Sequence, residues 1–90
     1  MQIDIYDTYM TASNGNIIHF DVLMKHGARK EIAVQHAREF LTSIGESADK
    51  LKSERCNFCH SDVVNKEIKT QIEKIGYYIL QMEGCPTPYR

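Results

Sequence analysis

MTASNGNIIHF (residues 10–20) contains the signal that decides the fold, which is Asn14 followed by Gly15. A type I′ turn needs two successive residues with positive φ, and Asn-Gly is the pair that supplies them most readily. Apolar and polar residues alternate on both sides of this pair, as they do in half-buried strands. The stretch therefore predicts a β-hairpin of residues 2–10 and 17–24 with a two-residue loop.

A two-residue loop sets the register of the hairpin and with it the two faces. It places Asp7 opposite Val22, and the neighbouring expected pairs are Tyr9–Phe20 and Ile5–Met24. The face expected to form the core carries Ile3, Ile5, Tyr9, Ile18, Phe20, Val22 and Met24. The polar face, open to water or to a partner, carries Asp4, Tyr6, Thr8, His19 and Asp21. Asp7 is the exception on the apolar face, and we expect it to accept hydrogen bonds from a loop or a hydroxyl group.

Two helices and a third strand are expected after the hairpin. Residues 30–45, KEIAVQHAREFLTSIG, have apolar residues at helical spacing and Gly45 as a C-terminal cap. That apolar stripe consists of Ala33, Val34, Ala37, Phe40, Leu41 and Ile44. Asn65 is a suitable N-cap for a second helix, residues 66–75, which Gly76 ends. The segment YYILQME, residues 77–83, then reads as a strand.

This order of elements, ββααβ, predicts a single small α+β domain. The N-terminal hairpin and the C-terminal strand would form one sheet, with two helices packed on one face. The domain is expected to span residues 1–85, and residues 86–90, which include both prolines, form a flexible C-terminal tail.

Composition excludes several classes of partner. Eleven basic residues stand against twelve acidic ones, and no basic run interrupts the balance, so we expect no nucleic-acid binding. The first ten residues lack the basic start and apolar run of a signal peptide, and no segment has membrane-spanning length. We therefore expect a cytoplasmic protein with no membrane partner. Thiols stay reduced in the cytoplasm, so a cysteine pair there suggests metal binding or catalysis before a disulfide.

The segment CNFCH, residues 56–60, fits three chemistries: covalent haem attachment, part of a zinc site, or a dithiol redox pair. Haem attachment follows export, and burying a macrocycle would leave a chain of 90 residues too little core. No haem is therefore expected. Glu54 and Asp62 flank the cysteines, and their negative charge disfavours the thiolate that redox catalysis by Cys56 and Cys59 requires.

Zinc is the cofactor that these residues favour. If the helices alternate in direction, the third strand brings Cys85 to the same end of the domain as Cys56 and Cys59. Three thiolates and one imidazole are a common tetrahedral zinc set. The predicted ligands are Cys56, Cys59, Cys85 and His60, with His19 as the rival fourth ligand. The alternative is that the cysteines only pack as small semi-buried residues.

Two other functions stay open at this point. The first is a small enzyme that uses the polar sheet face, with His19 as base and Asp21 or Asp4 orienting it. The second is an interaction module that forms a homodimer through a sheet edge. The sequence identifies no partner for His26 or His36, and both are expected to be surface residues.

The segments IDIYDTYM, IIHFDVLM, CNFCHSD and GYYILQMEGC together resemble the bacterial domain-of-unknown-function family two-thousand-and-twenty-four. The resemblance runs from Ile3 to Cys85. It implies a compact α+β domain of bacterial origin and no particular activity. The positions that match the recurring segments of the family are Asp4, Tyr6, Asp7, Tyr9, His19, Phe20, Asp21, Cys56, Cys59, His60, Gly76, Tyr77 and Cys85.

Overall fold

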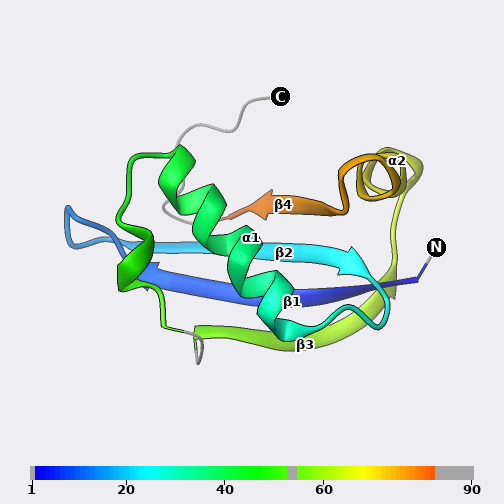
Figure 1. Cartoon of the computed structure of the whole chain (residues 1–90), viewed down its shortest axis with the longest axis horizontal. Coiled ribbons are helices and arrows are strands. Elements are labelled where there is room, and N and C mark those ends of the chain that lie inside the picture. The colour runs from blue at the N-terminus through cyan, green and yellow to red at the C-terminus, as the bar shows by residue number, and fades with distance from the viewer. Residues whose placement is uncertain (1, 53–54, 83–90) are drawn as a thin grey trace.

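The computed structural model describes residues 2–52 and 55–82 and contains one four-stranded antiparallel sheet (Figure 1). The strand order is β3-β1-β2-β4. The strands are β1 (Gln2–Thr11), β2 (Ile17–Lys25), β3 (Cys56–Val63) and β4 (Tyr77–Gln81), and the helices are α1 (Lys30–Ser43), η1 (Ala48–Lys50) and α2 (Lys66–Ile75). The predicted α+β class is confirmed. The predicted end of the domain and the tail lie outside the described residues.

The loop of the β1–β2 hairpin has three residues, Ser13 to Gly15, where two were predicted. The Ala12 N–H donates to Asn16 O at 2.7 Å, and the Gly15 N–H donates to Ala12 O at 3.0 Å. Gly15 has φ 90°, whereas no described residue other than glycine has positive φ. Asn14 therefore has the ordinary backbone of a type I turn, and Gly15 alone supplies the left-handed residue that closes the loop.

The extra loop residue shifts the register by one. Asp7 pairs with Asp21 and Thr8 pairs with Phe20, so the predicted pairing of Asp7 with Val22 is wrong. A shift of one residue turns every side chain of a strand to the other face. The core residues predicted for β2 are buried as expected, but the β1 residues buried on that face are Tyr6, Thr8 and Met10, while the predicted core residue Ile3 is buried on the other face. Asp7 consequently lies on the polar face, together with His19 and Asp21.

Helix α1 lies across the core face of the sheet (Figure 1). Its predicted apolar stripe is confirmed: Ala33, Val34, Ala37, Phe40 and Leu41 are buried, and Ile44 packs beside them. The rings of Phe20 and Phe40 are 4.7 Å apart. Gly45, with φ 84°, and Glu46 donate backbone bonds to Thr42 O and Leu41 O, which is a Schellman ending.

Strand β3 contains CNFCH and has no counterpart in the predicted order, in which no strand stands between the two helices. It pairs with β1 along the edge of the sheet, with a register shift between Ile5 and Tyr6. Only Cys56 of this strand is buried. An edge strand with one buried residue has no apolar alternation, so its sequence lacks the usual strand pattern. Pairing of two copies through such an edge stays a prediction.

Helix α2 begins and ends at local signals that the sequence identified, and β4 starts after Gly76 as predicted but ends at Gln81, where the predicted strand ran to residue 83. The Ile68 N–H donates to the Asn65 side chain at 2.9 Å, and Gly76 has φ 96°. Ile72 packs with Ile3 and Leu23 in a second cluster, separate from the core under α1. Ile3 and Leu23 alternate with the core residues along β1 and β2, so they point to the sheet face opposite α1. Helix α2 therefore packs at one end of that opposite face, whereas both helices were expected on the same face. None of the described helices is long and apolar enough to cross a membrane.

Candidate functional site

Asp7, His19 and Asp21 come together on the sheet face opposite α1. Asp7 of β1 lies directly opposite Asp21 of β2, and His19 is two residues from Asp21 along the same strand. One ligand atom from each of the three lies within 4.8 Å of the other two. The side chains of His19 and Asp7 are 31% and 37% exposed, so solvent reaches the cluster.

The two carboxyl groups of the cluster differ in their affinity for a proton. Burial raises the pKa of Asp21, and the neighbouring Asp7 carboxylate raises it further, to about 6. Burial also acts to raise the pKa of Asp7, but the hydrogen bonds to His19 and Asp21 outweigh this and lower it. Two carboxylates at this distance disfavour full ionisation, so Asp21 holds the shared proton until near-neutral pH.

His19 and Asp7 form a hydrogen bond, in which His19 Nε2–H donates to Asp7 Oδ1. The ring of Tyr9 stands edge-on to the imidazole at 6.1 Å, and the Arg55 guanidinium lies 5.0 Å from the centre of the Tyr9 ring. On the third side of the cluster, Asp21 Oδ1 is buried and accepts no hydrogen bond within the described part of the chain. A buried carboxylate oxygen without a donor is uncommon and calls for a ligand, ion or water.

The cysteines of CNFCH occupy different environments. Cys56 is fully buried in the core, where the Thr8 hydroxyl lies 3.4 Å from its Sγ. Burial raises the pKa of the Cys56 thiol. Cys59 is exposed, and its Sγ lies 3.1 Å from His60 Nδ1. Cys85 falls outside the described residues, so the predicted set of Cys56, Cys59, His60 and Cys85 stays a prediction.

Asp4 was predicted to orient His19, but it belongs to another network. The Asp4 carboxylate is almost fully buried and interacts with His26 Nδ1 at 2.7 Å, the Ser61 hydroxyl at 2.7 Å and the Gly27 N–H at 3.0 Å. Burial acts to raise the pKa of Asp4, but these hydrogen bonds outweigh it and lower the pKa. The sequence offered no partner for His26, which is exposed as expected and contacts Asp4 because the turn after β2 folds back onto β1.

The sequence likewise identified no partner for His36, whose side chain is only 18% exposed. Its ring stacks on Tyr77 of β4 with the centroids 3.9 Å apart, and its Nδ1 lies 3.4 Å from Glu39 Oε1. These contacts join α1 to the edge strand of the sheet. Neither the turn that carries His26 nor the stacking of His36 follows from periodicity, because both depend on where separate elements pack.

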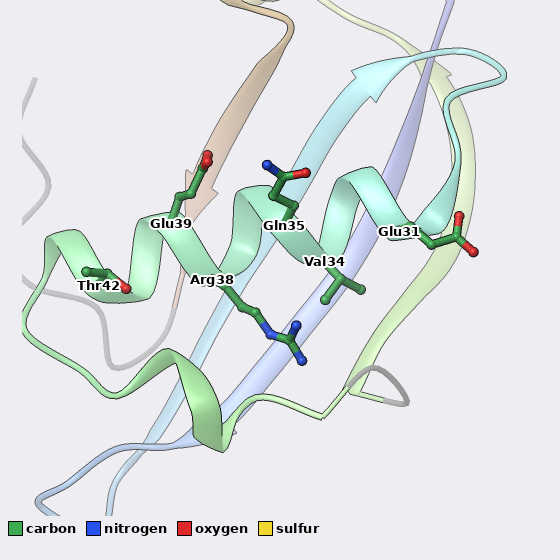
Figure 2. A pocket seen from close by; sticks show the side chains of 6 residues that line it. All are labelled: Glu31, Val34, Gln35, Arg38, Glu39 and Thr42. Atoms are coloured by element: carbon green, nitrogen blue, oxygen red, sulfur yellow. The ribbon is translucent and has the colours of Figure 1, made fainter.

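A surface depression lies along α1, away from the Asp7–His19–Asp21 cluster (Figure 2). Its lining residues all come from this helix: Glu31, Val34, Gln35, Arg38, Glu39 and Thr42. Arg38 extends to one side of the helix and donates to Leu51 O at 3.1 Å. Because α1 covers the core face, this depression and the cluster lie on opposite sides of the sheet.

A family model described as "Domain of unknown function (DUF2024)" matches residues 1–82. The chain belongs to this family. The fold of this DUF2024 domain is similar to the NMR structure of protein NE1680 from Nitrosomonas europaea, a structural genomics target, with a TM-score of 0.83 and 42% sequence identity. The match covers 96% of this chain and 100% of that one. Among curated proteins, no significant match is found. The relationship that the sequence segments suggested is thereby confirmed, and it carries no assigned activity.

Proposed function

We propose that this DUF2024 domain binds a divalent transition-metal ion of the zinc type through Asp7, His19 and Asp21. The observation that carries the proposal is the mutual proximity of three ligand atoms, within 4.8 Å, from one imidazole and two carboxylates. Imidazole nitrogen and carboxylate oxygen are both ordinary zinc ligands. Other first-row metals also accept this set, so the proposal concerns a class of ion with zinc as its representative.

The electrostatics of the cluster support a cation as the missing partner. Burial and the Asp7 carboxylate opposite raise the pKa of Asp21 to about 6, and Asp21 Oδ1 is buried without a donor among the described residues. A divalent ion between the two carboxylates would displace that proton and satisfy the unpaired oxygen. Metal binding to such a site releases protons, which can be measured.

The open side of the cluster favours a binding function over a purely structural one. Structural zinc sites are closed by four protein ligands, whereas sites that act on other molecules keep a position for water or a bound group. Here three protein ligands lie on a solvent-exposed sheet face. A metal ion held there would keep at least one coordination position open to small molecules.

Isothermal titration of chelator-treated protein with ZnCl₂ tests the proposal. We expect one ion per chain, and we expect Asp21→Asn and His19→Gln each to weaken binding by at least about tenfold, because each removes one ligand. Asp49→Asn changes an acid on η1 outside the cluster and should bind zinc like the parent protein. Equal zinc affinity in the Asp21→Asn and Asp49→Asn proteins would rule out this site.

The same titration separates the carboxylate–imidazole site from the predicted sulfur site. If Cys56, Cys59, Cys85 and His60 hold the ion, Cys59→Ser should weaken binding and Asp21→Asn should not. Cobalt(II) in place of zinc gives an independent readout, because thiolate ligands add intense sulfur-to-metal absorption that oxygen and nitrogen ligands lack. We expect the cobalt protein to lack that absorption.

The metal-free alternative is acid–base chemistry by the same three groups. In that case His19 would act as the base and Asp7 would orient it, in the place that was predicted for Asp21 or Asp4. A zinc stoichiometry near zero would favour this alternative over the proposed function, since nothing in it requires an ion.

A further inference from the structure

A second group of reactive side chains lies on β3: Cys59, His60 and Asp62. Cys59 Sγ is 3.1 Å from His60 Nδ1, and His60 Nε2 is 3.8 Å from Asp62 Oδ2. The imidazole therefore stands between a thiol on one side and a carboxylate on the other. The side chains of His60 and Asp62 are 54% and 62% exposed, and Cys59 is exposed too, so a dissolved reagent can reach the thiol.

A β-bulge makes the contact between Cys59 and His60 geometrically feasible. In a regular strand, successive side chains point to opposite faces, and neighbours such as Cys59 and His60 would point apart. Here Tyr6 pairs with Phe58 and Ile5 with His60, which leaves Cys59 as the extra residue of β3. Bulges re-aim side chains in this way and are common beside functional sites. His60 and Asp62 are two residues apart along β3, so their side chains point to the same face of the sheet without a bulge.

The order of the three groups suits proton transfer from the thiol. A carboxylate beside Nε2 favours the tautomer that carries its proton on that nitrogen, which leaves Nδ1 able to accept a proton. Nδ1 is the nitrogen in contact with the Cys59 thiol. The other groups that face His60 are Ile5, opposite it on β1, and Asp21 of β2, whose carboxyl group interacts with it electrostatically.

We propose that Cys59 is a reactive thiol that exchanges with low-molecular-weight disulfides, with His60 as the base and Asp62 orienting it. None of these three groups belongs to the Asp7–His19–Asp21 cluster proposed to bind metal. It also separates the two cysteines of the CxxC segment: Cys59 reacts alone, since Cys56 is buried in the core with its thiol against the Thr8 hydroxyl.

The exchange conserves electrons and protons. His60 Nδ1 takes the proton of Cys59, and the thiolate attacks one sulfur of the small disulfide. The disulfide bond of the reagent breaks as a new sulfur–sulfur bond to Cys59 forms. The departing thiolate receives the proton from the His60 imidazolium. The products are a mixed disulfide on Cys59 and one free small thiol, so no external oxidant is needed.

The test is the rate of mixed-disulfide formation with oxidised glutathione, followed by peptide mapping so that each cysteine is read separately. At pH 7 we expect Cys59 to react at least about tenfold faster than in the His60→Gln protein, since positioned bases contribute this much or more. Near pH 10, where free thiols ionise unaided, the parent and variant should react at similar rates. That convergence distinguishes the loss of a base from a change in structure.

Two further variants sharpen the result. Asp62→Asn should slow Cys59 at pH 7 by a smaller factor than His60→Gln. His36→Gln replaces an imidazole that stacks on Tyr77 of β4 and should leave the rate at Cys59 unchanged. The proposal is overturned if Cys59 reacts equally fast at pH 7 with and without the His60 imidazole, or if Cys56 in the folded protein reacts faster than Cys59.

Discussion

Asp7 and Asp21 lie directly opposite each other on β1 and β2, and burial together with the Asp7 carboxylate raises the pKa of Asp21 to about 6. This relationship exists because the hairpin loop has three residues. With a two-residue loop, Asp7 would face the core and His19 would lack its carboxylate partner. The candidate metal site is thus a consequence of one extra residue in a turn.

The Asp7–Asp21 pair should make stability depend on pH. Because the pKa of Asp21 is raised on folding, the native state binds more protons than the unfolded chain between about pH 4 and pH 6, and the free energy of unfolding falls as pH rises through this window. In chelator-treated protein, Asp21→Asn should remove this fall and add about 1 kcal/mol of stability at pH 7, after discounting for solvent screening. Urea unfolding between pH 4 and pH 8 measures it. A parent protein whose midpoint rises steadily across the window would contradict the expectation.

Zinc affinity should follow the protonation of Asp21. A proton on this carboxyl group competes with the ion, so the affinity should fall as pH drops below about 6 and level off above it. Titrations in buffers with different ionisation enthalpies would also detect the released proton. Thiolate ligands predict another profile, in which the affinity keeps rising toward about pH 8.5, where free thiols ionise.

Asp4 should be important for stability although it lies outside the candidate metal site. Its buried carboxylate holds the Gly27 turn and Ser61 of β3 against β1. Asp4→Asn should lower the free energy of unfolding at pH 7 by about 3 kcal/mol, since it weakens several hydrogen bonds to a buried charge. The pKa of Asp4 is lowered on folding, so its contribution is present above about pH 4 and is lost as pH falls further. Asp49→Asn, at an acid on η1, is the matched control, and equal stability of the two variants would count against the network.

The register of the hairpin can be tested with two threonines of one strand. Thr8 is completely buried under α1, whereas Thr11 of the same strand is exposed. Thr8→Asp should cost at least about 3 kcal/mol or prevent folding, because it buries an unpaired charge, while Thr11→Asp should change stability by less than about 0.5 kcal/mol. Thermal unfolding followed by circular dichroism compares them. The predicted two-residue loop would instead put Thr8 on the open face and make both substitutions mild.

Elements that depend on local chemistry were determined by the sequence alone. The stripe of α1 and its Gly45 ending, the Asn65 cap of α2 and the left-handed Gly76 are each set within one or two turns of helix. The buried face of β2 was also predictable, because its alternation is regular. Family membership followed from segments spread over the whole chain.

The register and the site were decided by tertiary structure. The Asn14-Gly15 pair is compatible with either a two-residue or a three-residue loop. Strand β1 has apolar residues on both faces, Ile5 and Tyr9 on one and Tyr6 and Met10 on the other, so either face could form the core. Tertiary packing selects between the two registers, because the observed one packs an apolar strand face under α1 and also places Asp7 on the polar face beside His19. Asp7, as the one carboxylate on the predicted apolar face, was the signal that the predicted register was wrong. Strand β3 and the contacts of Asp4 with His26 and Ser61 join residues far apart in the chain, and neither periodicity nor turn chemistry reports on such pairings.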